Sequence, residues 1–366
     1  MPQSAAAAPW IRAATSLALV LVAAEPALGD ERSSKDPLAE EIARCSTFLR
    51  ETTSTDEHWK DLKQGLEPAM ARVEAALKDD RRLLALERLA TTRMNLAGFA
   101  YVNALPDDKR DDAATLDSEW ARVGALLSAE LAVPSRTPLE GVKPAAVRAE
   151  GEAAFPQARN YYETSLEYGR ATSPWSGLFY LGVAQAQREF VSFCRSLSEP
   201  TDLKAPKVRS IAAELDALEA DLLEAYRPPA SIDRHSEFIG ASAALKEARE
   251  LDAAGLRYGA LLRYLHAAMR IDTLRPDAPA PDLESLPKRL LAFEPRFARG
   301  GVDHSIGRLY LETAQAHLAA GGNPAFSEAI ARDVLPRYFA ALAPAKPQPG
   351  KPAPSITVTL VRWPYT

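Results

Sequence analysis

Apolar residues recur every three or four positions along most of this chain of 366 residues. The pattern is strongest between Arg81 and Asn103, where good helix formers separate the apolar positions Leu83, Leu86, Leu89, Ala90, Met94, Ala97 and Val102. Segments of this kind follow one another up to Leu342, with no interleaved strands that could form an α/β sheet. The sequence therefore predicts an all-α fold of about twelve helices, joined as antiparallel hairpins.

Capping residues and prolines bound the expected helices. Asp36 and Pro37 start the first helix, because a capping side chain followed by proline in the first turn is the preferred order. The later helices are expected at about residues 56–78, 81–103, 115–131, 144–170, 173–197, 207–226, 232–252, 256–273, 286–293, 304–320 and 324–342. Within the predicted helical region 30–343, the proline-rich stretch 133–144 is the best candidate for an internal boundary.

The segment 244–272 has a more specific spacing than the rest. It places small residues where two helices would touch, a glycine at the turn and an alanine, aromatic, alanine series on the second helix, at Ala248, Leu251, Gly255, Ala260, Tyr264 and Ala267. In this the segment resembles a tetratricopeptide repeat, although Ala244 and Glu247 stand where that family has large apolar residues. Residues 306–338 resemble a second, looser copy, whose second helix is out of strict register.

The resemblance implies an α-solenoid, in which each helical pair buries one face against its neighbours and the stack leaves a concave binding surface. It brings no catalytic residues with it. A helical-repeat array without this family's register, and a closed helical bundle or toroid, are the alternatives for the fold.

The first 29 residues have the pattern of a secretory signal peptide. Arg12 precedes an apolar run at 13–24, and Ala27 and Gly29 are small residues at the two positions that a signal peptidase reads. Cleavage is expected before Asp30, with a cut after Ala24 as the alternative. The run is shorter than the roughly 20 residues that a membrane span requires, and no later segment approaches that length. We therefore expect an exported chain, periplasmic if the host has two membranes and otherwise extracellular.

The C-terminus differs from the helical body. Residues 344–354 contain five prolines and two lysines and predict a semi-rigid linker. In the tail at 355–366, alternation and β-branched residues predict a strand, in which Ile356, Val358 and Leu360 face one surface and Val361 and Trp363 the other. We expect this strand to dock on a partner, on a second copy of the chain, or on the chain's own groove; a disordered tail is the alternative.

Aromatic residues gather between Phe155 and Phe193, where nine of the chain's 27 lie. Because tyrosine and tryptophan supply contact area at small entropic cost, a recognition surface formed by Tyr161, Tyr162, Trp175 and Tyr180 is one interpretation. Several of the aromatics in this region have core spacing, so packing is the other interpretation.

The two cysteines, Cys45 and Cys194, both fall in predicted helices. In an exported protein a disulfide between them is plausible, and two separate buried thiols are the alternative. The five histidines are scattered without a familiar zinc spacing, and no cofactor motif is present, so neither a metal nor a cofactor is expected. With a net charge of −5 and both signs interspersed, the body offers no basic surface for nucleic acid.

These features together predict an exported, non-catalytic scaffold that binds a protein or peptide in the cell envelope or outside it. The alternative is a secreted enzyme, such as an all-helical toroid that cleaves acidic polysaccharides with Asn, His, Tyr and Arg. For that alternative the sequence offers the run Asn160-Tyr161-Tyr162, but no clustered Asn-His motif.

Overall fold

The computed structural model describes residues 36–54, 56–127, 139–229, 231–275 and 282–342. Over these residues the chain is helical, and its one β interaction is an isolated bridge between Lys204 and Val302. The predicted all-α class is confirmed. The predicted signal peptide, the linker at 344–354 and the tail at 355–366 lie outside the described residues.

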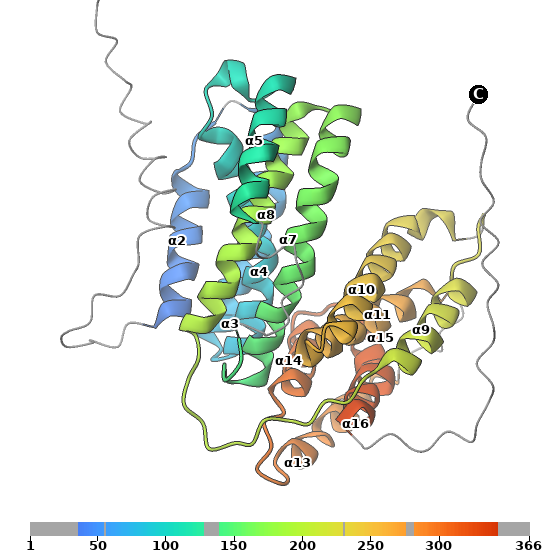
Figure 1. Cartoon of the computed structure of the whole chain (residues 1–366). Helices are drawn as coiled ribbons and strands as arrows, with labels where there is room; N and C mark the ends of the chain where they lie inside the picture. The colour runs from blue at the N-terminus through green and yellow to red at the C-terminus, as the bar shows by residue number, and fades with distance from the viewer. Residues whose placement is uncertain (1–35, 55, 128–138, 230, 276–281, 343–366) are drawn as a thin grey trace, which may run out of the picture.

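Six helices form a first group, which Figure 1 shows as an elongated bundle coloured blue to green. They are α2 (Pro37–Glu51), α3 (Glu57–Lys78), α4 (Arg82–Asn103), α5 (Ala113–Leu126), α7 (Ala145–Ala171) and α8 (Pro174–Ser196). The hairpin of α7 and α8 is closely packed, because a Cβ atom at Gly169 would lie 2.8 Å from the Cα of Gly177. Leu84, Leu89 and Val73 belong to the buried core of this group.

The remaining helices form a second group, coloured yellow to red in Figure 1. They are α9 (Ala212–Ala225), α10 (His235–Ala253), α11 (Arg257–Leu274), α12 (Leu286–Leu291), α13 (Glu294–Phe297), α14 (Ser305–Ala319), α15 (Pro324–Ala329) and α16 (Leu335–Leu342). A π-helical turn, Ile330–Val334, joins α15 to α16. A π turn takes up one residue more than an α-helical turn.

Helices α10 and α11 form the hairpin that the sequence predicts. Gly255 lies in its turn with φ +78°, a conformation that side chains with a Cβ rarely adopt. The repeat-like positions Ala248, Ala260 and Tyr264 are at most 1 % exposed. The hairpin is therefore confirmed, whereas membership of a repeat family stays a prediction.

The two groups meet along α7, and the buried core runs through both. At this contact the backbone amide of Gly259 in α11 donates to Oε2 of Glu152 at 2.9 Å, and a Cβ at Gly259 would lie 2.7 Å from the Glu152 Cβ. The chain crosses from one group to the other through residues 197–211. The expected boundary at 133–144 falls inside the first group, between α5 and α7, and its first six residues are outside the described ranges.

Candidate functional site

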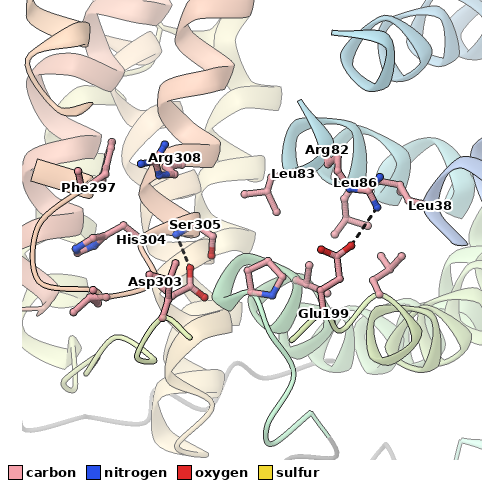
Figure 2. A pocket seen from close by; sticks show the side chains of 17 residues that line it. Leu38, Arg82, Leu83, Leu86, Glu199, Phe297, Asp303, His304, Ser305 and Arg308 are labelled. Carbon is pink, nitrogen blue, oxygen red and sulfur yellow. Dashed lines mark hydrogen bonds and ion pairs between the residues drawn. The ribbon is translucent and has the colours of Figure 1, made fainter. Parts of the chain in front are cut away.

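A groove with a volume of about 400 Å³ lies where the two groups meet (Figure 2). Its apolar lining comes from α2, α4 and the start of α7 on one side, and from the residues around α13 on the other. We call it the junction groove, and its main apolar side chains are Leu38, Leu83, Leu86, Val147, Leu197, Leu203, Phe297 and Val302. In Figure 2, Phe297 and His304 stand opposite Leu83 and Leu86.

The floor of the junction groove is fixed by caps on α7 that come from the distant segment 303–305. Helix α7 follows Pro144, which supplies no capping side chain of its own. Asp303 Oδ2 instead accepts a hydrogen bond from the Ala145 amide at 2.5 Å, and Ser305 Oγ accepts one from the Ala146 amide at 2.8 Å. Because both caps are buried, they tie the two groups together at this point.

The same loop is pinned on its other side by backbone hydrogen bonds with the segment around Lys204. The Lys204 amide donates to the Gly301 carbonyl, and the Asp303 amide donates to the Lys204 carbonyl, both at 2.8 Å. The Glu199 amide donates to the Lys143 carbonyl at 3.0 Å. Backbone hydrogen bonds therefore join three segments that are distant in sequence, around residues 143, 199–204 and 301–303, on one side of the groove.

Charged side chains surround the apolar lining. Arg82 Nη2 lies 3.5 Å from Glu199 Oε1, as Figure 2 shows, and donates to Asp36 Oδ1 at 2.9 Å. The hydrogen bond from Arg82 lowers the pKa of the Asp36 carboxyl. On the opposite side the Arg308 guanidinium lies over the Phe297 ring, 5.6 Å from its centre. The rim therefore presents both signs of charge around an apolar floor.

His304 is the one imidazole in the lining, and it is already bonded. Its Nδ1 lies 2.9 Å from the hydroxyl of Tyr338, and burial lowers the pKa of the ring. Asp303 beside it accepts the two backbone hydrogen bonds of Ala145 and Ser305. Both groups are thus engaged in holding the loop, and the arrangement suits binding better than proton transfer.

The predicted aromatic surface is divided in the structure. Tyr162 is 7 % exposed and stacks on Trp120 at 5.1 Å, so it belongs to the core. Tyr161 meets the edge of Tyr180 at 5.3 Å, and Tyr180 stacks on Tyr168 at 4.9 Å. These three tyrosines lie together near the surface, where Tyr168 is 42 % exposed.

Trp175, the fourth residue of the predicted surface, adjoins this group through Phe179, whose ring lies 5.5 Å from Trp175 and 6.3 Å from Tyr180. Its indole stacks on His58 at 4.1 Å, and its Nε1 donates to Asp56 Oδ2 at 3.2 Å. Its contacts therefore link the start of α8 to the start of α3. The packing interpretation describes Tyr162 well, whereas a recognition role for the other three residues stays a prediction.

Cys45 on α2 and Cys194 on α8 are buried and free in the structure, which corresponds to the alternative of two separate thiols. Burial raises the pKa of Cys45 to about 12 and that of Cys194 well above its usual value. Among the described residues no group of three or more His, Cys, Asp or Glu side chains could hold a metal ion. The tail residues expected to dock, Ile356, Val358, Leu360 and Trp363, lie outside the described ranges.

The comparisons with known proteins place no constraint on these sites. No family model matches the chain, and no curated protein or solved structure is detectably similar to it. Within the described ranges, every helix is too short or too polar to cross a membrane.

Sequence reasoning missed the junction groove and the caps that build it. Gly300 and Gly301, followed by Asp303 and Ser305, do form a recognisable pattern of a turn and a helix start. That pattern predicts a cap for the helix that follows. The pattern does not indicate that Asp303 and Ser305 also cap α7, whose first residues are about 160 positions away.

Proposed function

We propose that this protein is a non-catalytic scaffold whose junction groove binds an extended, partly apolar segment of another protein. The junction groove itself carries the proposal. Its volume of about 400 Å³ lies within the range of ligand pockets, and an apolar floor with a charged rim is the usual anatomy of a recognition site. A pocket of this size takes a few side chains and not a folded domain.

The helical hairpins support the same proposal. If α10 and α11 represent a tetratricopeptide-like unit of a solenoid, the protein belongs to a class that presents concave surfaces to peptides. An extended occupant also suits the parallel backbone bridge between Lys204 and Val302, which both belong to or adjoin the lining of the groove. The predicted tail at 355–366 has the alternating apolar character that such a site would select, so it serves as a probe of that chemistry.

The proposed location is outside the cytoplasm. The expected signal peptide at 1–29 supports export, to the periplasm in a host with two membranes and to the exterior in other hosts. The partner is then a protein of the envelope or of the surroundings.

Photo-crosslinking tests the proposed site directly. The full chain would carry p-benzoylphenylalanine at Leu203, which lines the groove and is 44 % exposed, or at Leu223 on α9, which is 63 % exposed and serves as the matched control. The probe is a labelled peptide with the sequence of residues 355–366, compared with a scrambled version. We expect crosslinking to the probe at Leu203 alone, with the scrambled peptide much weaker.

Substitutions test whether Leu203 contributes to the affinity for the probe peptide. Leu203→Asp should weaken binding of the probe by about tenfold or more, because burying a leucine contributes roughly 1.5–3 kcal/mol. Leu223→Asp should leave binding unchanged. Crosslinking at Leu223 with none at Leu203 would place the site elsewhere, and an intramolecular crosslink from Leu203 to residues 355–366 would make the chain's own tail the occupant instead of a partner.

The enzyme alternative has one observation in its favour. Arg263, His266 and Tyr310, which are residue types that polysaccharide lyases use, line a second cleft. That cleft has a volume of about 80 Å³, well below the roughly 300 Å³ at which ligand pockets usually begin. Incubation with acidic polysaccharides, followed by ultraviolet absorbance of unsaturated products, decides between the two functions.

A further inference from the structure

The second cleft lies between the two groups and is separate from the junction groove. Its walls come from α4, α7, α8, α11 and α14, so both groups contribute to it. We call it the acid cleft, and its polar lining includes Glu87, Glu150, Gln187, Arg263, His266 and Tyr310.

Two carboxyl groups of the acid cleft have no hydrogen-bonding partner. Glu150 is only 8 % exposed, yet none of the described residues donates a hydrogen bond to it or to Glu87. By contrast, the buried carboxylate of Glu152 on the same helix receives the Gly259 amide and pairs with Arg148 at 2.7 Å. Glu150 is buried and Glu87 is half-buried, and a ligand that donates hydrogen bonds in the cleft would offset the cost of leaving both carboxyls without a protein partner.

The electrostatics of the cleft indicate that positive charge is missing. Burial, together with the nearby Glu87, raises the pKa of Glu150 to about 7, and burial also raises the pKa of Glu87. The opposing charge, Arg263, is shared with a third acid, since its Nε lies 3.0 Å from Glu247 Oε2. The carboxyl groups around the cleft therefore outnumber the cationic groups that face them.

The remaining polar groups are already engaged with one another. His266 Nε2 accepts a hydrogen bond from Arg270 at 2.8 Å, and burial lowers the pKa of this ring to about 3, so it is neutral. The Tyr310 hydroxyl donates to the Leu262 carbonyl at 2.9 Å, and the Gln187 amide donates to a neighbouring glutamine. What the cleft still offers is the two carboxyl acceptors and one donor, Arg263 Nε, which is buried beside Glu247 without a hydrogen bond.

The apolar part of the lining limits the ligand further. Met94, Phe190 and Met269 stand beside the carboxyls, and the free volume is about 80 Å³. A ligand must therefore be small, donate hydrogen bonds, carry positive charge and tolerate thioether and aromatic neighbours. A metal ion does not fit this description, because the described residues contain no group of three suitable ligands.

We propose that the acid cleft binds the primary ammonium group of a small aliphatic amine, with Glu87 and Glu150 as acceptors. The three N–H donors of an ammonium match two carboxylates, and the alkyl chain contacts Met94 and Phe190. The cation favours the ionised form of both carboxyls, so binding releases protons to the solvent. This proposal is independent of the function proposed for the junction groove.

The proton release depends on every titratable group that faces the carboxyl pair. Arg88 interacts with Glu87, and Arg263 with both carboxyls, whereas Cys194 and Tyr310 stay protonated because burial raises their pKa values. Glu247 and His266 lie next to Arg263 and complete the set. Of these groups, Glu150 has the pKa closest to neutrality, so its proton is the one released at pH 7.

Isothermal titration calorimetry of the full chain tests the proposal with n-butylamine as the probe and n-butanol as its neutral counterpart. Measurements at pH 7 in two buffers with different ionisation enthalpies count the protons released. We expect butylamine to bind with proton release, and butanol to bind at least tenfold more weakly. Equal binding of the two probes, or no binding of butylamine, would overturn the proposal.

Substitutions identify the residues responsible. Glu150→Gln should weaken butylamine binding by about tenfold and remove most of the proton release, because a charged acceptor is lost. Glu163→Gln, on the exposed face of the same helix, changes the net charge equally and should have no effect. If Glu150→Gln does not fold, Glu87→Gln provides the same test, and unchanged affinity in the folded variant would contradict the assignment.

Discussion

The buried caps on α7 allow a quantitative prediction for Asp303→Ala. This substitution removes hydrogen bonds from two backbone amides, those of Ala145 at 2.5 Å and Ser305 at 2.9 Å, at a carboxylate that is 4 % exposed. Each hydrogen bond to a charged group contributes roughly 1.5–3 kcal/mol, and the amides left behind remain buried. We therefore expect the free energy of unfolding to fall by about 3 kcal/mol, whereas Asp303→Asn, which keeps one acceptor oxygen, should lose about half as much.

Urea unfolding followed by circular dichroism measures this change. The matched control is Asp112→Ala, because Asp112 caps α5 locally by accepting the Thr115 amide at 2.9 Å and is partly exposed. Loss of an ordinary cap costs about 1 kcal/mol. If Asp303→Ala costs no more than Asp112→Ala, the long-range caps do not hold the two groups together at the junction groove.

Three further predictions concern the interior. Because burial lowers the pKa of His266 to about 3, only the unfolded chain binds a proton on this ring between pH 6.5 and about 4.5, and the free energy of unfolding falls as the pH falls. His266→Gln should reduce this fall by roughly 2 kcal/mol, as measured by urea unfolding at several pH values. An unchanged dependence on pH would contradict the prediction. Gly259→Ala should lower the free energy of unfolding by about 1–3 kcal/mol, because its Cβ would meet Glu152; a neutral effect would show that the helices can separate. Thiol titration should detect Cys45 and Cys194 only after denaturation, two per chain without reductant, and fewer than two would restore the disulfide.

The helices were predictable because their signals are local. Asp36 with Pro37 and Ser173 with Pro174 begin helices through the expected caps, and the apolar periodicity of 82–103 reappears as α4. One start was misplaced: α9 was expected near Lys207 and begins at Ala212. The residues before it are not helical, and long-range contacts hold them, such as the hydrogen bond from the Tyr258 hydroxyl to the Pro206 carbonyl at 3.0 Å.

The sites were not predictable in the same way. The junction groove combines residues from Leu38 to Arg308, and no local pattern marks residues that meet only after folding. Glu87 and Glu150 each resemble an ordinary surface glutamate, because helical periodicity predicts which face is apolar but not which glutamate the second group will cover. The density of aromatic residues alone does not distinguish a surface from a core; of the two interpretations, packing describes Tyr162, which is buried.

The caps on α7 also affect the order in which the protein can mature. Synthesis delivers α7 long before the segment that caps it, which lies 158 residues further along the chain. Until that segment has left the ribosome, the first amides of α7 can be satisfied only by water. The first group can collapse early, but it reaches its final stability only when the segment 303–305 has folded onto the start of α7.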